Sequence, residues 1–252
     1  MLWHRDASRR SKALMRNHNS FAQFVYDYWS YYRELEDDFL ATRKYVSFDS
    51  ANYSTYSIEY LKLYQAVCSE IDVLGKSMAY AVNHSFKPED RKNNILKWWF
   101  EIQDCYYASR KQGIAYIEGQ PTNKLYEADC LFLGVKKIVP WSSFRTEQYM
   151  AKDNSTRIRA VNSSVPAWWS SYNKVKHNRI TLGSRKNENA NYSKANLGNL
   201  IDALGALYLL EKSYMESIGT QDDLESFFDQ SRLFLNREFA TSGDIEDLFI
   251  QL

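Results

Sequence analysis

The sequence predicts a mainly α-helical protein, a helical bundle that carries a small irregular or β-hairpin insertion around residues 113–140. Several segments place apolar residues at three- and four-residue intervals, which is the helical repeat. Only nine Gly and four Pro occur among 252 residues, fewer than a turn-rich sandwich or barrel needs. Hydrophobic content of 44% is enough for a sizeable core. We therefore expect residues 1–252 to form one helical domain, with residues 113–165 as an insertion or loop region within it.

Three helices are predicted in the first half of the chain. Residues 20–40 carry one apolar stripe, formed by Phe21, Phe24, Val25, Tyr28, Tyr32, Leu35 and Phe39. Residues 57–82 repeat this pattern with Leu61, Tyr64, Cys68, Ile71, Leu74, Met78 and Val82. Pro88 fits the first turn of a third helix, whose apolar positions are Ile95, Trp99, Ile102 and Tyr106.

The sequence pattern changes after residue 112. The stretches GIAYIEG and CLFLGVKKIV are short, β-prone and bounded by Gly, Pro and Asn, which favours a hairpin, although a short buried helix fits equally well. Residues 145–166 are polar and irregular, and a loop is expected there. A helix begins again at Pro166, and the polar stretch TLGSRKNENANYS that ends it predicts an exposed, mobile loop.

The most regular helical pattern follows that polar loop. Ser193 is its expected N-cap, and its apolar repeat runs through Leu197, Leu200, Ile201, Leu204, Leu207, Tyr208 and Glu211. Gly198 and Gly205 lie seven residues apart on one face, where a neighbouring helix can approach closely. The C-terminal stretches GTQDDLESFFDQSRLFLNREF and SGDIEDLFIQL predict one or two further helices.

Composition and motifs exclude several function classes. The net charge of +1 gives no global electrostatic case for nucleic acid, so any basic site must be local. Cys68, Cys105 and Cys130 are far apart and form no CxxC pair, which indicates a reduced protein without a structural zinc site. No phosphate-binding, dinucleotide-binding or metalloprotease motif occurs. No apolar run approaches the roughly 18 residues needed to span a bilayer. We expect a cytoplasmic protein with no membrane partner, no cofactor and no metal.

The stretch WWSSYNKVKHNR, residues 168–179, contains most of the candidate functional residues. On a helix, residues four apart share a face, so Trp169, Asn173 and His177 form one row. Tyr172, Lys176 and Arg179 form a neighbouring row. An imidazole is suited to proton transfer near neutral pH, and Asn173, one turn before His177, would fix its tautomer. Over residues 172–188 the cationic residues are Lys174, Lys176, Arg179, Arg185 and Lys186, against one acid, Glu188.

Two interpretations of this strip stay open. The cations would bind a phosphate backbone, and His177 would move a proton at a ribose hydroxyl without a metal. Alternatively, Lys, His and Arg end a helix because cations complement the helix dipole, and they carry no function. A small nucleotide bound near Trp168, Tyr172 and Lys176 ranks lower, because no phosphate-cradling loop supports it.

The stretch YNKVKHNR is followed by a polar loop and then by ANLGNLIDALGALYLLE. This order resembles the HEPN superfamily. The earlier stretch YSIEYLKLYQAVCSEIDVLGK is similar to the long packing helix of that superfamily. The resemblance covers residues 55–82 and 166–215. It implies an all-α, often dimeric protein from a toxin, antiviral-defence or RNA-processing setting. Catalytic members pair the histidine with an upstream arginine, with four to six residues between the two. Ser170, Ser171 and Tyr172 occupy those positions, so only His177 carries over.

The sequence therefore supports two function classes. In the first, the chain binds RNA and acts as a metal-independent endoribonuclease, with His177 as the catalytic group and Asn173, Lys176 and Arg179 as its supports. Glu70 or Asp72 on the packing helix would orient the cations, and a homodimer would bring two copies of His177 together as acid and base. The substrate-binding residues would be Tyr172, Lys174, Arg185 and Lys186, together with these two acids. In the second, the chain is a non-catalytic interaction or dimerisation module with a protein partner, and both acids belong to an exposed helix face.

Overall fold

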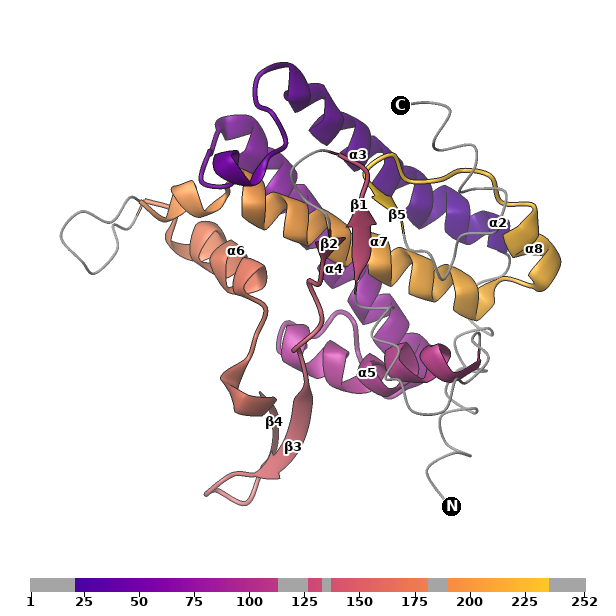
Figure 1. Cartoon of the computed structure of the whole chain (residues 1–252). Helices are drawn as coiled ribbons and strands as arrows, with labels where there is room; N and C mark the ends of the chain where they lie inside the picture. Colours follow the sequence, from indigo (N-terminus) through magenta and orange to yellow (C-terminus); the bar gives the residue numbers. More distant parts are fainter. Residues whose placement is uncertain (1–20, 113–126, 133–136, 181–189, 236–252) are drawn as a thin grey trace, which may run out of the picture.

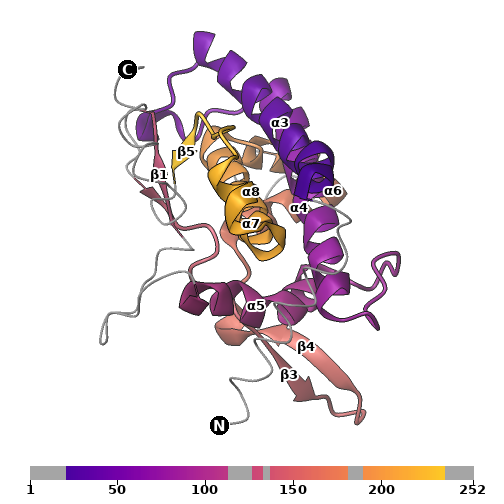
Figure 2. The ribbon, with the colours of Figure 1, turned by 90° about the vertical axis from the view of Figure 1, so that its right-hand side faces the viewer.

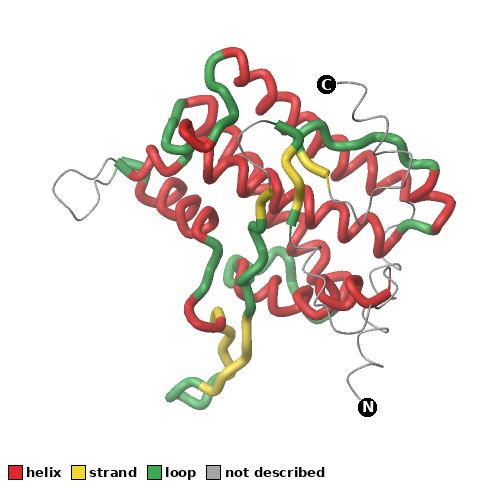
Figure 3. The backbone as a smooth tube through the Cα atoms, in the orientation of Figure 1, coloured by secondary structure: helices red, strands yellow, loops and turns green. Residues whose placement is uncertain are grey.

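The computed structural model describes residues 21–112, 127–132, 137–180 and 190–235. Within these ranges the chain is mostly helical with small antiparallel sheets, which confirms the predicted fold class (Figure 1, Figure 3). The α-helices are α2 (Phe21–Phe24), α3 (Ser30–Ala41), α4 (Ile58–Val82), α5 (Ile95–Gln112), α6 (Ala167–Asn178), α7 (Leu197–Ile218) and α8 (Gln221–Glu225).

Shorter elements complete the described chain. One π-helical turn, η1 (Val25–Trp29), joins α2 to α3. The 3-10 turns are η2 (Thr42–Lys44), η3 (Ser50–Asn52), η5 (Val161–Ser163) and η6 (Asn191–Lys194). The strands are β1 (Ala128–Cys130), β2 (Lys137–Ile138), β3 (Thr146–Met150), β4 (Thr156–Ala160) and β5 (Phe234–Leu235).

Helix α7 forms the centre of the molecule. Figure 2 shows it surrounded by α3, α4, α5 and the sheet that contains β1 and β5. Every residue from 203 to 215 is buried, so the helix is covered on all sides and not only along the predicted stripe. A Cβ added to Gly205 would overlap the Ile138 side chain, which explains the glycine. The predicted cap was wrong, because Asn196 accepts the Asn199 N–H at 3.0 Å.

Helix α4 forms as predicted and packs directly against α7. The Ser57 hydroxyl accepts the Tyr60 N–H at 3.1 Å and caps the helix. The predicted stripe is confirmed, with Tyr64, Cys68, Ile71, Leu74 and Met78 buried. The stripe of residues 21–39 is also confirmed, although its helix passes through the π-helical turn η1, which brings Trp29 into the core.

Two further predictions were wrong, one for the start of a helix and one for a segment expected as loop. Helix α5 begins at Ile95, and Pro88 lies in the turns before it, where the Asn94 side chain accepts the Leu96 N–H. Residues 146–160, expected as loop, form the antiparallel hairpin β3–β4, which projects away from the helices (Figure 3). Its polar sequence reflects this position, because both faces of the ribbon largely meet solvent.

The predicted insertion around 113–140 is confirmed in part. GIAYIEG lies outside the described residues, whereas β1 and β2 pair antiparallel, with Ala128 opposite Ile138. Strand β5 adds to the other edge of β1. This strand corrects the prediction of a long helix over 219–239, since α8 covers only five residues. The last predicted helix, at residues 242–252, lies outside the described ranges. None of the helices described here has the length and apolar character needed to cross a membrane.

Candidate functional site

The first turn of α6 is anchored in the core by its two tryptophans. Trp168 and Trp169 are both buried. The Trp168 indole donates to the Pro140 carbonyl at 3.3 Å, and its ring lies 5.1 Å from that of Trp141. The Tyr64 hydroxyl on α4 donates to the Trp168 carbonyl. These contacts fix the direction of α6, so that its C-terminal half extends from the body of the protein (Figure 1).

Tyr172 belongs to the core more than to an open surface. Its ring packs against those of Tyr64 and Trp169, at 6.1 and 5.2 Å. Burial, followed by the charges of Cys68 and Asp72, raises the pKa of the Tyr172 phenol to about 12. The Lys176 ammonium lies 5.5 Å from the ring centroid in a cation–π contact. Tyr172 therefore positions Lys176 and leaves little of its own ring free for a ligand.

The C-terminal half of α6 is a polar, basic surface. Asn173, Lys174, Lys176, His177 and Arg179 are all exposed. Among the described residues, none of the four basic side chains forms an ion pair or a hydrogen bond with another side chain. His177 thus lies in solvent, without the partner that Asn173 was predicted to provide. The predicted residues Arg185 and Lys186 lie outside the described ranges.

The chain returns to the end of α6 after the polar loop. The Tyr192 N–H donates to the Arg179 carbonyl at 3.0 Å, and the Asn191 side chain donates to the Asn178 carbonyl at 2.9 Å. Two carbonyl groups at the helix end are therefore satisfied by η6. Residues 178 and 191 lie side by side, although the sequence predicted only a mobile loop between the helices.

This return places two tyrosine rings beside the basic surface. Tyr56 and Tyr192 pack edge to face with their centroids 5.0 Å apart. Tyr56 is 38% exposed, and Asn196 bridges to it in an isolated β-bridge. The sequence analysis missed both tyrosines. Tyr192 had a weak signal, as the one aromatic residue in a polar stretch, whereas Tyr56 had none, because it lies more than 100 residues earlier.

The two predicted acids lie on opposite faces of α4. Asp72 faces the neighbourhood of Tyr172, but it accepts the Trp98 indole N–H at 3.1 Å and pairs with Lys76 at 2.6 Å. Glu70 faces Glu211 and Tyr28 instead, and burial raises its pKa. The structure therefore brings Asp72 near the base of the site and leaves Glu70 away from it.

The arrangement supplies binding chemistry and a single group for proton transfer. Three exposed cations could contact an anion, and the edge-to-face pair of Tyr56 and Tyr192 lies at the same end of α6 as Arg179. His177 alone would serve as acid or as base, but cleavage with proton transfer at both oxygens needs two groups. In the part of the chain that is described, no three His, Cys, Asp or Glu residues gather as metal ligands.

Comparisons of the chain with protein-family models, with curated proteins and with solved structures found no match. The functional assignment therefore depends on the geometry of this surface.

Proposed function

We propose that the chain binds single-stranded RNA through the C-terminal half of α6 and the adjoining Tyr56–Tyr192 pair. One observation carries the proposal. Lys174, Lys176 and Arg179 are exposed, and none forms an ion pair within the described ranges. The Tyr192 N–H donates to the Arg179 carbonyl, so the Tyr56–Tyr192 pair lies at the same end of α6. Phosphates would contact the cations, and an unstacked base would lie against a tyrosine ring. The resemblance of this segment to the HEPN superfamily points to the same ligand.

The helix-dipole alternative explains part of this surface. Cations in the last turn of α6, which contains Lys176 and His177, stabilise the helix by complementing its dipole. Lys174 precedes that turn, and the tyrosine pair has no relation to the dipole. Helix capping therefore explains neither Lys174 nor the tyrosine pair. A surface that combines basic side chains with aromatic rings is better explained by a polyanionic ligand.

RNA cleavage is the finer proposal, and it requires two copies of the chain. Each protomer contributes one imidazole, His177, with the Lys176 and Arg179 charges close by along the same helix. A two-fold axis near this helix end would bring two imidazoles to one phosphate, where one removes the 2′-hydroxyl proton and the other protonates the leaving oxygen. Such a nuclease is a homodimer that needs no metal.

Binding is tested with a labelled single-stranded RNA of about 20 nucleotides and three proteins. The wild type is compared with Lys174→Gln/Lys176→Gln/Arg179→Gln and with a matched control, Lys87→Gln/Arg91→Gln/Lys92→Gln. The control removes three exposed cations between α4 and α5. We expect the α6 variant to bind at least about tenfold more weakly, and the slope of log Kd against log salt to fall by about two. Equal losses in both triple variants would mean that general charge, not this surface, holds RNA.

Cleavage is tested separately, by incubating total RNA with the protein in EDTA and repeating the reaction with His177→Ala. The nuclease proposal expects cleavage by the wild type and a loss of at least about a hundredfold in the variant. Equal activity from both proteins, or none from either, rules out cleavage by His177 and leaves the binding proposal intact. Light scattering on the same samples reports whether the active species is a dimer.

A further inference from the structure

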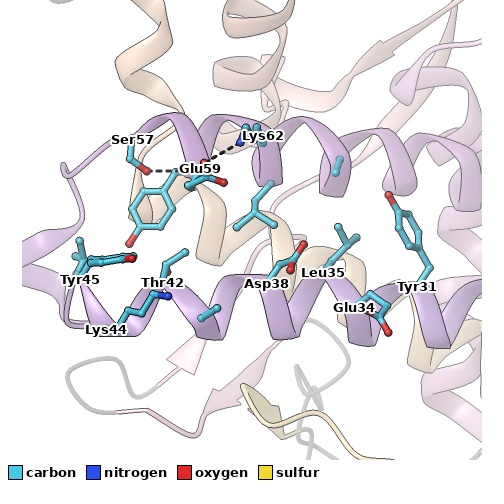
Figure 4. Close-up of a pocket in the computed structure, with 15 residues that line it drawn as sticks. Tyr31, Glu34, Leu35, Asp38, Thr42, Lys44, Tyr45, Ser57, Glu59 and Lys62 are labelled. Carbon is cyan, nitrogen blue, oxygen red and sulfur yellow. Dashed lines mark hydrogen bonds and ion pairs between the residues drawn. The ribbon is translucent and has the colours of Figure 1, made fainter.

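A groove of about 750 Å³ lies between α3 and the first half of α4, away from the basic end of α6. Figure 4 shows the two helices side by side, with Tyr31 at one end of the groove and Tyr45 at the other. The helical rise over these positions gives a length of about 20 Å. This length matches about four turns of a partner helix, of which one face would enter the groove.

The floor of the groove is apolar. Leu35 on α3 faces Leu63 and Ala66 on α4, and the small side chain of Ala66 leaves the groove open at that point. The two end tyrosines remain accessible, with Tyr31 41% and Tyr45 79% exposed. An apolar floor with accessible aromatic residues at both ends is typical of grooves that receive the apolar face of an amphipathic helix.

The charges around the groove are arranged asymmetrically. On the α4 wall, Lys62 and Glu59 neutralise each other in an ion pair of 2.8 Å. On the α3 wall, Asp38 points between the two helices and Glu34 lies one turn earlier on the rim (Figure 4). Neither carboxylate has an ion-pair partner in the described part of the chain. Lys44 lies at the far end, 5.0 Å from the Tyr45 ring centroid.

We propose that this groove binds an amphipathic helix of another protein whose apolar face is flanked by Lys or Arg. The apolar face would cover Leu35, Leu63 and Ala66. A basic flank would pair with Asp38 and Glu34 and would lie against the Tyr31 ring, since carboxylates and aromatic faces both attract cations. A partner with an acidic flank would be repelled by the same wall. The groove shares no lining residue with the RNA surface, so either proposal survives the failure of the other.

The test uses a labelled synthetic helical peptide of about 14 residues, with a leucine face and lysine flanks. A second peptide replaces the lysines with glutamates. Binding is measured by fluorescence anisotropy on the full chain, on Glu34→Gln/Asp38→Asn, and on a matched control, Glu89→Gln/Asp90→Asn, which removes two exposed carboxylates elsewhere. Ala66→Trp fills the groove, and Ala41→Trp does so from an exposed position that tolerates the change.

We expect the lysine peptide to bind the wild type and the matched control equally. We expect a loss of roughly tenfold in the groove double variant, since two surface ion pairs are removed. Either tryptophan variant should abolish binding while thermal unfolding shows an intact fold. The proposal is overturned if the lysine peptide does not bind, if the glutamate peptide binds as tightly, or if both double variants weaken binding equally. It is also overturned if light scattering shows a dimer that Ala41→Trp dissociates, because a second copy then occupies the groove.

Discussion

Two buried glutamates with opposite surroundings allow a sharp test of the packing. Glu211 on α7 and Glu36 on α3 both have 0% exposure. Neither carboxyl oxygen of Glu211 has a hydrogen-bond partner among the residues that the structure describes. Glu36 accepts hydrogen bonds from the Tyr32 and Ser231 hydroxyls and from the backbone N–H groups of Arg232 and Leu233. Replacement of the two residues should therefore change stability in opposite directions.

Glu211→Met should stabilise the protein. A buried polar group without a partner costs about 1–3 kcal/mol, and methionine fills a similar volume without that cost. For a chain of this size, the gain corresponds to a rise in Tm of roughly 2–4 °C per kcal/mol. Glu36→Gln should lower the free energy of unfolding by about 3 kcal/mol or more, because the amide turns a donor toward groups that donate to Glu36.

The pH dependence of the Glu211 effect identifies its cause. Burial, and then the charge of Glu70, raises the pKa of the Glu211 carboxyl well above its ordinary value of 4.5. The folded state keeps a proton that the unfolded chain releases above pH 4.5, so wild-type stability falls as pH rises toward the folded pKa. Glu211→Gln does not lose stability in this pH range, because its amide does not titrate. The stability difference between Glu211→Gln and wild type should grow between pH 5 and 7, by up to about 1.4 kcal/mol per pH unit.

Urea unfolding followed by circular dichroism at pH 5, 6 and 7 provides the measurement. A Glu211→Met protein that is less stable than wild type at pH 7 would show that this carboxyl has a partner in solution. A difference between Glu211→Gln and wild type that stays constant over this range would show that Glu211 is ionised in the folded protein. Either result would refute the reasoning.

Three further predictions concern single positions. Gly205→Ala should destabilise the protein by about 1–3 kcal/mol in urea unfolding, because the added methyl group overlaps the Ile138 side chain. Adding Ile138→Ala to this variant should relieve the overlap, so the stability loss of the double variant should be smaller than the sum of the two single losses. Burial raises the pKa of the Asp202 carboxyl to about 6. The contribution of Asp202 to stability is therefore present below about pH 4 and is lost as the pH rises through 6. Asp202→Asn should remove this pH dependence, which amounts to no more than about 3 kcal/mol in the free energy of unfolding. Tyr56→Ala should weaken RNA binding in anisotropy by roughly fivefold or more, whereas Tyr56→Phe keeps the ring and should bind as wild type; equal losses in both would exclude stacking at this ring.

The fold was predictable where a strong helical period coincides with burial. The apolar stripes of α4 and of residues 21–39 identified core residues correctly, because one face of each helix meets α7. The same logic described α7 incompletely, since Lys212 and Ser213, which lie outside the predicted repeat, are buried too. The β3–β4 hairpin was missed because its residues are polar on both faces, which is the composition of a loop.

The candidate site was predictable only as far as it is local. The exposure of Lys174, Lys176, His177 and Arg179 follows from helical spacing within α6, because the apolar positions of this helix face the core. The opposite placement of Glu70 and Asp72 also follows from that spacing, since two residues on a helix turn the side chain by about 200°. Tyr56 joins the site through a contact across more than 100 residues, which no local pattern encodes.

Crosslinking is the most direct measurement of where RNA binds. Single-stranded RNA containing 4-thiouridine would be irradiated on the wild-type protein, and the crosslinked residues identified by mass spectrometry. We expect crosslinks at Tyr56 and Tyr192 and in the α6 segment that contains Lys176, with loss of these crosslinks in the triple α6 variant. Crosslinks confined to another basic surface, such as Arg157 and Arg159 of the β3–β4 hairpin, would contradict the assignment of RNA binding to the end of α6.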